Sequence, residues 1–229
     1  MKMGKIGYAC MAMMGMGLIG AQSAFADVTA VYKMTYRDGG SGMQTIKYAD
    51  KKHVRLDMMD VSNHETTMMK LGDKVYMING EVVQDMEELA GMMAMMGKGG
   101  KKHADHAPVK YVDTGRTETI AGITGKVYRF EERGKKHEVV LAKNKDLQAA
   151  VLGLVELTKA LSSVSSDKNA MGQAQEDASL KSMAMLRLDD HIRLQSMNTK
   201  GISKSVFELP AKPQQTGGMG ALMKGYLGH

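Results

Sequence analysis

Short segments of alternating apolar and polar residues, each closed by glycine, aspartate or asparagine, occupy much of this chain. In residues 28–36 an apolar side chain recurs at every second position, a spacing that places these side chains on one face of a strand. Residues 75–78 and 81–84 lie on either side of Asn79-Gly80, a pair that supplies the positive φ angles of a type I′ hairpin turn. The pattern predicts an antiparallel β-sheet.

The same criteria predict further strands, each bounded by turn residues. They fall at residues 43–48, 53–59, 66–71, 109–112, 126–132, 137–143, 192–199 and 203–209. Pro210 and Pro213 end the ordered part, because proline has no N–H group to donate to a sheet. We expect a single domain over residues 27–213 and a flexible, glycine- and methionine-rich tail at residues 214–229.

A first helical insertion is predicted near residues 86–97, where the apolar spacing changes from two to that of a helix. The common apolar face consists of Met86, Leu89, Ala90, Met93 and Met96. Met92 and Met95 widen this face beyond what packing on one side requires. The helix is therefore expected to have apolar surface left for a further contact.

A second helical insertion is predicted near residues 146–188. Asp146 is a suitable N-cap, and an apolar face follows it. The members of this face are Leu147, Ala150, Val151, Leu154, Thr158 and Leu161. Residues 162–166 interrupt the pattern, and a second helix is expected from Asp167 to about Leu188.

The first 26 residues have the form of a secretory signal peptide. Lys2 and Lys5 precede an uncharged apolar stretch at residues 6–20, and Ala24-Phe25-Ala26 has the small-x-small pattern of a cleavage site. This stretch is short for a membrane span. We expect cleavage after Ala26 and export to the periplasm. The only cysteine, Cys10, is removed with the signal, so the mature domain must be stable without disulfides.

The charge pattern argues against nucleic-acid binding. The formal net charge is +6, but apart from Lys98, Lys101 and Lys102 the basic residues are spread along the chain. There is no tryptophan and there are only three phenylalanines, so stacking aromatics are scarce as well. The basic loop at residues 98–106 is expected to keep the chain soluble, and it also suits peripheral contact with an anionic membrane surface.

Methionine is unusually frequent, with 24 in 229 residues. A single methionine at strand or helix spacing is ordinarily a core residue, because its flexible side chain fills irregular gaps. So large a set has two further interpretations, an adaptable lining for apolar ligands or thioether ligands for a soft metal.

The order of the segments resembles a known family of secreted bacterial domains of unknown function, related to the outer-membrane lipoprotein carriers LolA and LolB. The similar segments are "HVRLDMM", "GDKVYMINGEVVQDM", "GRTETIAGITGKVYRFEE" and "NTKGISKSVFELPA", within residues 28–213. The resemblance implies an α+β fold in which an antiparallel sheet curls into an open half-barrel. It also implies that helices cover the concave face, with an apolar cavity between helices and sheet.

Methionines suit the lining of such a cavity, since an unbranched side chain can repack around acyl chains of different shapes. We therefore expect the ligand-binding residues to lie where the sheet meets the helices. The candidates are Met58, Met69, Met77, Met86, Leu89, Met92, Met93 and Met96.

Copper binding is the alternative interpretation of the same residues. Thioether and imidazole groups both suit Cu(I), and the candidate ligands lie within a short stretch. They are Met92, Met95, Met96, His103 and His106. The histidines, however, lie in a lysine-rich loop whose charge opposes cation binding, so solvated loop residues are the simpler identity for them.

Known catalytic motifs find no match in the sequence. The run Gly39-Gly40-Ser41-Gly42-Met43 lacks the final glycine of a Gly-x-Ser-x-Gly motif and lies in a turn between predicted strands. The segment beginning His64-Glu65 lacks the second histidine of a zinc protease helix. We expect a protein that is not an enzyme and that carries no cofactor.

The sequence thus predicts a periplasmic binding or carrier protein for an apolar molecule, a lipid or the acyl chain of a lipoprotein. We expect it to act as a monomer. A periplasmic copper-binding protein and a protein-interaction module that docks through the methionine-rich helix are the alternatives.

Overall fold

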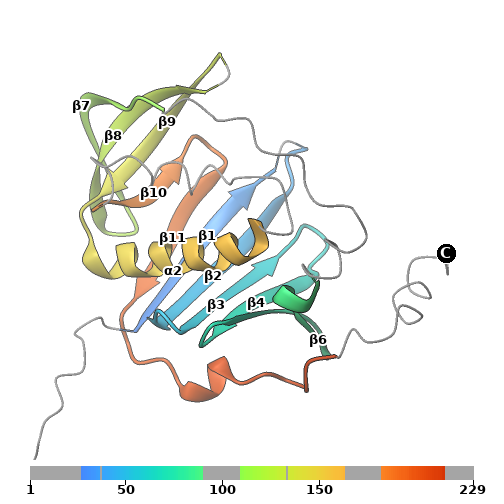
Figure 1. Cartoon of the computed structure of the whole chain (residues 1–229). Helices are drawn as coiled ribbons and strands as arrows, with labels where there is room; N and C mark the ends of the chain where they lie inside the picture. Colours follow the sequence, from blue (N-terminus) through green and yellow to red (C-terminus); the bar gives the residue numbers. More distant parts are fainter. Residues whose placement is uncertain (1–26, 37, 90–108, 133, 163–181, 215–229) are drawn as a thin grey trace, which may run out of the picture.

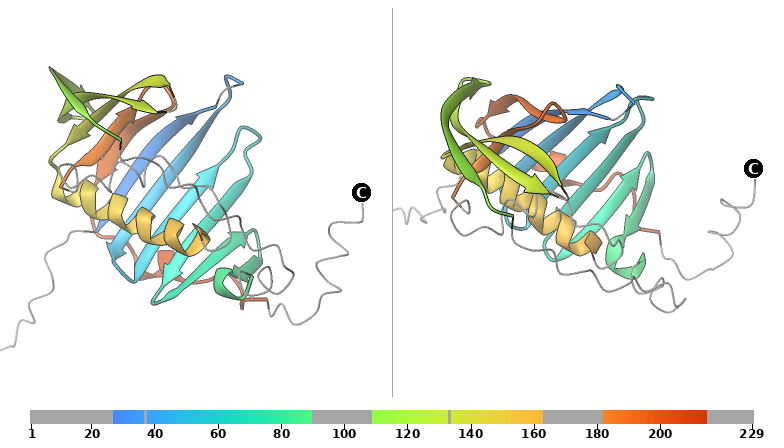
Figure 2. Two further views of the ribbon diagram at one scale, coloured as in Figure 1. Left: turned by 45° about the horizontal axis from the view of Figure 1, so that its top comes forward. Right: turned by 90° about the horizontal axis from the view of Figure 1, so that it is seen from above.

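The computed structural model describes residues 27–36, 38–89, 109–132, 134–162 and 182–214. These residues form an open antiparallel sheet of 11 strands in the order β6-β5-β4-β3-β2-β1-β11-β10-β9-β8-β7. Figure 1 shows one long helix, α2, lying across the strands. Figure 2 shows that the sheet curves strongly towards its β7–β9 end.

The elements are bounded as follows. The strands are β1 (Val28–Thr35), β2 (Ser41–Asp50), β3 (His53–Met59), β4 (Glu65–Leu71), β5 (Lys74–Asn79), β6 (Val82–Asp85), β7 (Val112–Ile120), β8 (Ile123–Glu132), β9 (Lys135–Ala142), β10 (Ala184–Leu188) and β11 (Ile192–Asn198), and the helices are α2 (Lys145–Ser162) and the 3-10 helix η1 (Lys204–Phe207). Residues 86–89 are also helical.

The first six strands follow one another as hairpins, as the alternating sequence predicts. The β5–β6 hairpin is confirmed, but its turn lies one residue further on. Asn79 pairs with Val82, so Gly80 and Glu81 form the turn. Gly80 has a φ of 60°, whereas Glu81 is not among the residues with positive φ. This geometry is that of a type II′ turn rather than the predicted type I′ turn, because only the first turn residue needs the left-handed region.

Strand β11 pairs with β1, which joins the two halves of the sheet. The prediction for residues 192–199 is confirmed, but the two neighbouring predictions are wrong. Residues 184–188, expected in a helix, form β10 between β9 and β11. Residues 203–209, expected as a strand, contain η1, which lies against β3 through a hydrogen bond from Arg55 to the Val206 carbonyl (3.1 Å). Tertiary contacts override the local pattern in both places.

The strand predicted at residues 109–112 is wrong except at its last residue, because residues 109–111 are not in a strand and β7 begins at Val112. It forms a hairpin with β8 in which Ile120 pairs with Ile123. The turn residues Ala121 and Gly122 both have positive φ, 50° and 77°. Alanine rarely adopts this conformation. Only Gly122 is therefore a residue type that marks such a turn in a sequence.

Helix α2 begins after Asn144, whose side-chain oxygen accepts a hydrogen bond from the Leu147 N–H group (2.9 Å). The N-cap is thus Asn144, and the predicted cap, Asp146, lies in the first turn. The helix contacts β1, β2, β3, β4 and β10. Its predicted apolar face is confirmed at Leu147, Ala150, Val151 and Leu154, all buried in the main core.

The main core lies between α2 and the sheet, and two smaller clusters complete it. One packs at β8, β9 and β10 around Tyr128, Phe130 and Met185. The other lies on the opposite side of β4–β6, where Leu209 and Ala211 of the C-terminal segment cover it. Among the residues that the structure describes, no helix combines the length and hydrophobicity needed to cross a membrane.

Candidate functional site

Methionines gather on the α2 side of the sheet, at its β3–β6 end. Leu56 of β3 pairs with Met68 of β4, which in turn pairs with Met77 of β5. Since paired residues share a face, these side chains form one row across three strands. Met68 is buried, whereas Met58 and Met77 are half-buried and pack against the main core.

The end of β6 adds two apolar side chains to this row. Met86 is buried in the main core and Leu89 packs against it half-buried. Asp85 starts the helical turn at residues 86–89, since its carboxylate accepts a hydrogen bond from the Glu87 N–H group (3.0 Å). We call Met58, Met68, Met77, Met86 and Leu89 the methionine face.

Asp85 is itself buried and fixes the start of this turn electrostatically. Its carboxylate binds the Lys74 ammonium at 2.7 Å. Burial disfavours the charged form of Asp85, but the hydrogen bonds from Lys74 and from the Glu87 backbone outweigh it and hold the pKa of Asp85 below its ordinary value. Asp85 thus connects the start of β5 to the helical turn that carries Met86 and Leu89.

Met69 does not belong to the methionine face, contrary to expectation. It is fully buried on the opposite side of the sheet, among Tyr76, Ile78 and Val83. Successive side chains of a strand point to opposite faces, so Met68 and Met69 cannot both face α2. Which of the two does so depends on the pairing with β3, and a single strand does not reveal that pairing.

The remaining predicted residues lie outside the described residues. These are Met92, Met93 and Met96 of the predicted apolar site, and Met92, Met95, Met96, His103 and His106 of the predicted copper site. The basic loop at residues 98–106 lies outside them as well. Within the described part of the chain, no group of three or more histidine, cysteine, aspartate or glutamate side chains is arranged to hold a metal ion.

Helix α2 lies very close to the sheet at its middle. A Cβ atom added to Gly153 would come within 2.7 Å of the Tyr48 ring and 3.1 Å of Val54 Cγ1. Protein side chains therefore fill the space between α2 and strands β2 and β3. Any apolar ligand on this side of the sheet must lie nearer to β4–β6, where the methionine face is half-buried.

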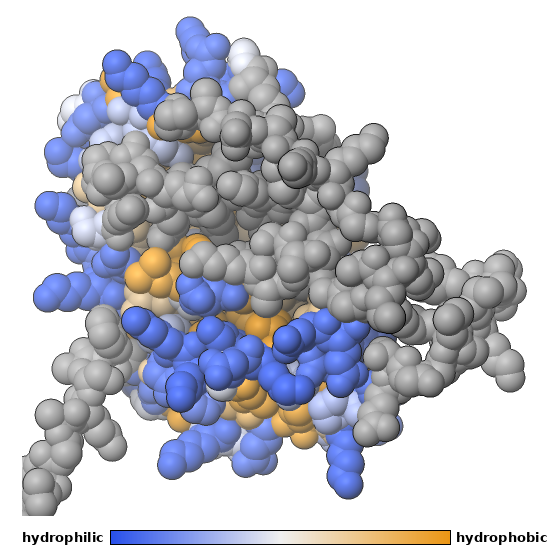
Figure 3. Space-filling view, in the orientation of Figure 1, coloured by the Kyte–Doolittle hydropathy of each residue, from blue (hydrophilic) through white to orange (hydrophobic). Residues whose placement is uncertain are grey.

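Polar groups border the methionine face. The ammonium of Lys70 on β4 lies 3.9 Å from the Glu156 carboxylate on α2. Figure 3 shows hydrophobic residues emerging between hydrophilic ones on the side of the molecule that carries α2. An apolar surface with few polar groups at its border is the usual composition of a site for a lipid-like ligand.

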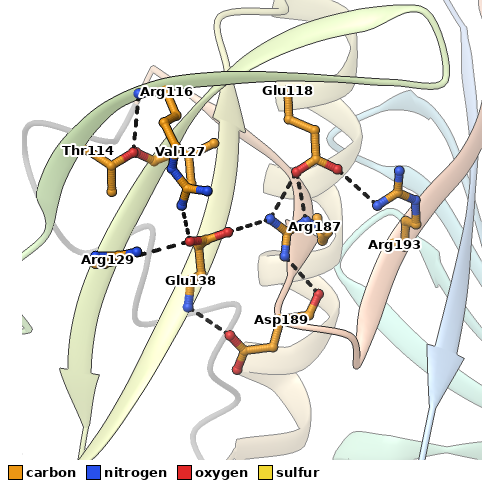
Figure 4. Close-up of polar contacts among 9 residues, drawn as sticks. All are labelled: Thr114, Arg116, Glu118, Val127, Arg129, Glu138, Arg187, Asp189 and Arg193. Carbon is orange, nitrogen blue, oxygen red and sulfur yellow. Dashed lines mark hydrogen bonds and ion pairs between the residues drawn. The ribbon is translucent and has the colours of Figure 1, made fainter.

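A network of charged side chains links β7 to β11 (Figure 4), and no local sequence pattern predicts it, because its partners lie up to 75 residues apart in the chain. At its centre the Arg187 guanidinium binds the carboxylates of Glu118 (2.9 Å) and Glu138 (2.8 Å). Arg116 also binds Glu138, and Arg193 binds Glu118 at 3.0 Å. Arginine forks match carboxylates in this way, so these contacts join four strands, β7, β9, β10 and β11.

The charges of this network stabilise one another. The Arg187 guanidinium, followed by that of Arg116, holds the pKa of Glu138 below its usual range. Burial would lower the pKa of Arg187, but hydrogen bonds to Glu138 and Glu118 outweigh this effect and raise it. Glu118 and Glu138 are each paired with at least two arginine side chains. We assign the network a structural role.

A pocket of about 400 Å³ lies at the end of the sheet where β1 begins and where β2 turns into β3. It is lined by Asp27, Ala49, Asp50, His53, Ile202, Lys204 and Phe207. Both of its carboxylates bind neighbouring groups: Asp27 accepts the Ile202 N–H (2.7 Å), and Asp50 accepts the His53 N–H (3.0 Å). The Asp27 bond ties the C-terminal segment to the start of β1, whereas the Asp50 bond closes the turn between β2 and β3.

Comparisons with known proteins found only weak similarity. No protein-family model matches the chain, and no curated protein matches it. Among solved structures, PNGF-II is similar over 82% of this chain with 10% identity and a TM-score of 0.32, and this chain spans 31% of the length of PNGF-II. A LolA superfamily protein from Nitrosomonas europaea, NE2245, is similar over 80% of this chain and 90% of its own, with 9% identity and a TM-score of 0.29. At these values any LolA-like relationship is distant.

Proposed function

We propose that this protein is a non-enzymatic, periplasmic binding or carrier protein for an apolar ligand, a lipid or the acyl chain of a lipoprotein. The observation that supports the proposal is the methionine face. Its members Met58, Met77 and Leu89 are half-buried beside a continuous core, on an open sheet. Half-buried apolar side chains of this kind can exchange contacts with one another for contacts with a ligand.

The energetics favour an acyl chain as the ligand. Burial of each CH₂ group contributes about 0.8 kcal/mol, so a chain of about ten carbons contributes about 8 kcal/mol against the cost of association, without any charged contact. Methionine tolerates chains of different shape, because its rotatable thioether repacks where a branched or aromatic residue would not. A site of this composition selects for apolar character rather than for one molecule.

The packing under Gly153 restricts where the ligand lies. Tyr48 and Val54 fill the interface below the middle of α2, so the proposed site extends from Met58 along β4 and β5 towards Leu89. Lys70 and Glu156 mark its border on the α2 side. The export signal at residues 1–26 belongs to this proposal, because a periplasmic carrier requires it.

Two neighbouring methionines provide a matched test. Met58 belongs to the methionine face, whereas Met59, the next residue of β3, is 42% exposed. Glutamine has nearly the length and shape of methionine but carries an amide, which is costly to bury without a partner. The affinity of the purified variants Met58→Gln and Met59→Gln for a fluorescent fatty acid is measured by titration and compared.

We expect Met58→Gln to weaken fatty-acid binding about tenfold and Met59→Gln to leave it within about twofold. Met77→Gln should repeat the effect of Met58→Gln, which guards against a local disturbance at one position. The proposal fails if the parent protein binds no fatty acid, or if Met58→Gln and Met77→Gln bind as well as the parent. Native mass spectrometry of the same sample identifies any lipid that remains bound through purification.

A further inference from the structure

Strands β1–β6 carry a single charged side chain on the face that α2 covers. The structure describes every residue of these six strands, and their pairing places the other charged side chains on the opposite face, together with Met69. The exception is Lys70 of β4, whose ammonium faces Glu156 of α2. A charged group on an apolar face is costly unless it has a partner, so the surroundings of Lys70 indicate which partner suits it.

Lys70 lies where the methionine face meets α2. It pairs with Val54 of β3 and with Val75 of β5, and both valines are buried in the main core. Met68, two residues earlier in β4, points to the same side of the sheet. The Lys70 side chain is only 16% exposed, so water solvates a small part of it.

The ion pair of Lys70 is a loose one. Among the described residues, the ammonium groups of Lys47, Lys74 and Lys126 contact carboxylates at 2.7, 2.7 and 3.0 Å, whereas Lys70 lies 3.9 Å from Glu156. The last distance is too long for a hydrogen bond. Lys70 is nevertheless the least exposed of these four lysines. Its three N–H donors can therefore take a closer anionic oxygen.

The closed part of the interface below α2 ends at Lys70. Tyr48, Val54 and Lys70 are directly paired across β2, β3 and β4. Gly153 packs against the first two, which leaves no room for a ligand there. The methionine face begins beside the third, at Met68. An acyl chain that lies along the methionine face thus has its α2 end next to the Lys70 ammonium.

We infer that Lys70 binds the carboxylate of a free fatty acid whose chain lies on the methionine face. The inference rests on the proposed carrier function and narrows its ligand, because the acyl chains of a lipoprotein are esters or amides and bring no charge to this position. One ammonium matches the single charge of a carboxylate. A phosphate monoester carries more charge and more oxygens, and Lys70 is the only cation that strands β1–β6 place on this face.

Glu156 competes with the fatty acid for Lys70. Its side chain is 42% exposed, so its carboxylate has water beside it and can turn away when a ligand carboxylate arrives. Two carboxylates at one ammonium repel each other, and Glu156 therefore weakens fatty-acid binding. Lys70 and Glu156 should for this reason have opposite effects on affinity, which a purely structural ion pair does not predict.

Calorimetric titration at pH 7 with decanoate and with decanol tests the inference, because the two ligands share a chain and differ in charge. We expect the parent to bind decanoate about tenfold more tightly than decanol. Lys70→Met should weaken decanoate binding about tenfold and leave decanol binding within about twofold. Lys70→Gln, which keeps a polar side chain, should lose the preference in the same way.

The matched control is Lys33→Met, which removes an exposed cation from the opposite face of β1. It should leave both affinities within about twofold of the parent. Glu156→Gln should strengthen decanoate binding about twofold to threefold without changing decanol binding. Unchanged decanol binding also shows that each variant keeps its folded site.

Three results would overturn the role of Lys70. One is a parent that binds decanol as tightly as decanoate. Another is an equal loss of both ligands in Lys70→Met, and the third is a loss of decanoate in Glu156→Gln as large as that in Lys70→Met, since both point to a structural ion pair. Decyl phosphate that binds more tightly than decanoate would assign the site to lipid phosphates instead.

The carrier function and the role of Lys70 fail in different ways. A parent that binds decanoate and decanol equally, with both weakened by Met58→Gln, keeps the carrier function and contradicts the carboxylate site. A parent that binds neither ligand contradicts the carrier function, and the inference about Lys70 falls with it.

Discussion

Gly153 of α2 lies directly over the ring of Tyr48 on β2, at a distance where a Cβ atom would be 2.7 Å from the ring. Tyr48 and its neighbour Val54 are both buried in the main core. The missing side chain at position 153 therefore sets how closely the helix approaches the sheet. It also decides that the interface below the middle of α2 is closed to a ligand.

We predict that Gly153→Ala destabilises the protein. Alanine favours a helix over glycine by about 1 kcal/mol, but overpacking against a buried ring costs about 1–3 kcal/mol. Urea unfolding should show a lower free energy of unfolding for this variant. Leu152→Ala, at an exposed position of the same helix, should change it by less than about 0.5 kcal/mol. A variant more stable than the parent would show that α2 has room to move outwards.

The buried hydroxyl of Tyr32 should contribute to stability through one hydrogen bond. It donates to the Met185 carbonyl at 2.9 Å and so links β1 to β10. Burial raises the pKa of Tyr32, which stays neutral and a donor at physiological pH. Tyr32→Phe leaves the carbonyl without this donor and should cost about 1–2 kcal/mol in chemical unfolding. Tyr36→Phe, on an exposed ring, should cost much less; equal losses would contradict the assignment.

Arg187 should be the most important member of the charged network. Its side chain is 13% exposed and binds two carboxylates, so Arg187→Met leaves Glu118 and Glu138 with fewer partners in a partly buried place. We expect a loss of about 2–3 kcal/mol in the free energy of unfolding. Arg129, 66% exposed and 3.8 Å from Glu138, provides the control, and Arg129→Met should cost less than about 0.5 kcal/mol.

Asp57 should make the stability of the protein depend on pH. Its carboxylate binds Lys47 (2.7 Å), Thr67 (2.7 Å) and Arg55 (2.6 Å). Burial opposes ionisation, but the hydrogen bonds from these three groups outweigh it and hold the pKa of Asp57 below its ordinary value. A group with a lowered folded-state pKa stabilises the fold above its unfolded pKa, about 4, and this contribution is lost as pH falls through the folded pKa.

The test is Asp57→Asn, compared with the parent by urea unfolding at several pH values. The variant should be less stable at pH 7 and should lose less stability than the parent when the pH falls from about 5 to about 2. Asp73→Asn makes the same change of charge in the exposed β4–β5 turn and should keep the pH profile of the parent. Parallel profiles for the parent and Asp57→Asn would contradict the role given to Asp57.

Local sequence patterns determined much of this fold. Alternation over residues 28–36 and 53–59 predicted β1 and β3, because the period of two belongs to the strand itself and needs no partner. The apolar face of α2 at Leu147, Ala150, Val151 and Leu154 followed from helical spacing in the same way. Turn residues predicted the β5–β6 hairpin, although the turn lies one residue further on and is of another type.

Only the tertiary structure decided which face each strand turns towards the helix and which distant residues meet. Met69 was expected beside Met58, but the pairing of β4 with β3 places Met69 on the side of the sheet away from α2. Residues 184–188 form a strand because β9 and β11 provide partners for it on both sides. Glu118 and Arg193 are 75 residues apart in the chain and yet hydrogen-bonded. Periodicity is a property of neighbouring residues, whereas register and ion pairing arise only when distant strands come together.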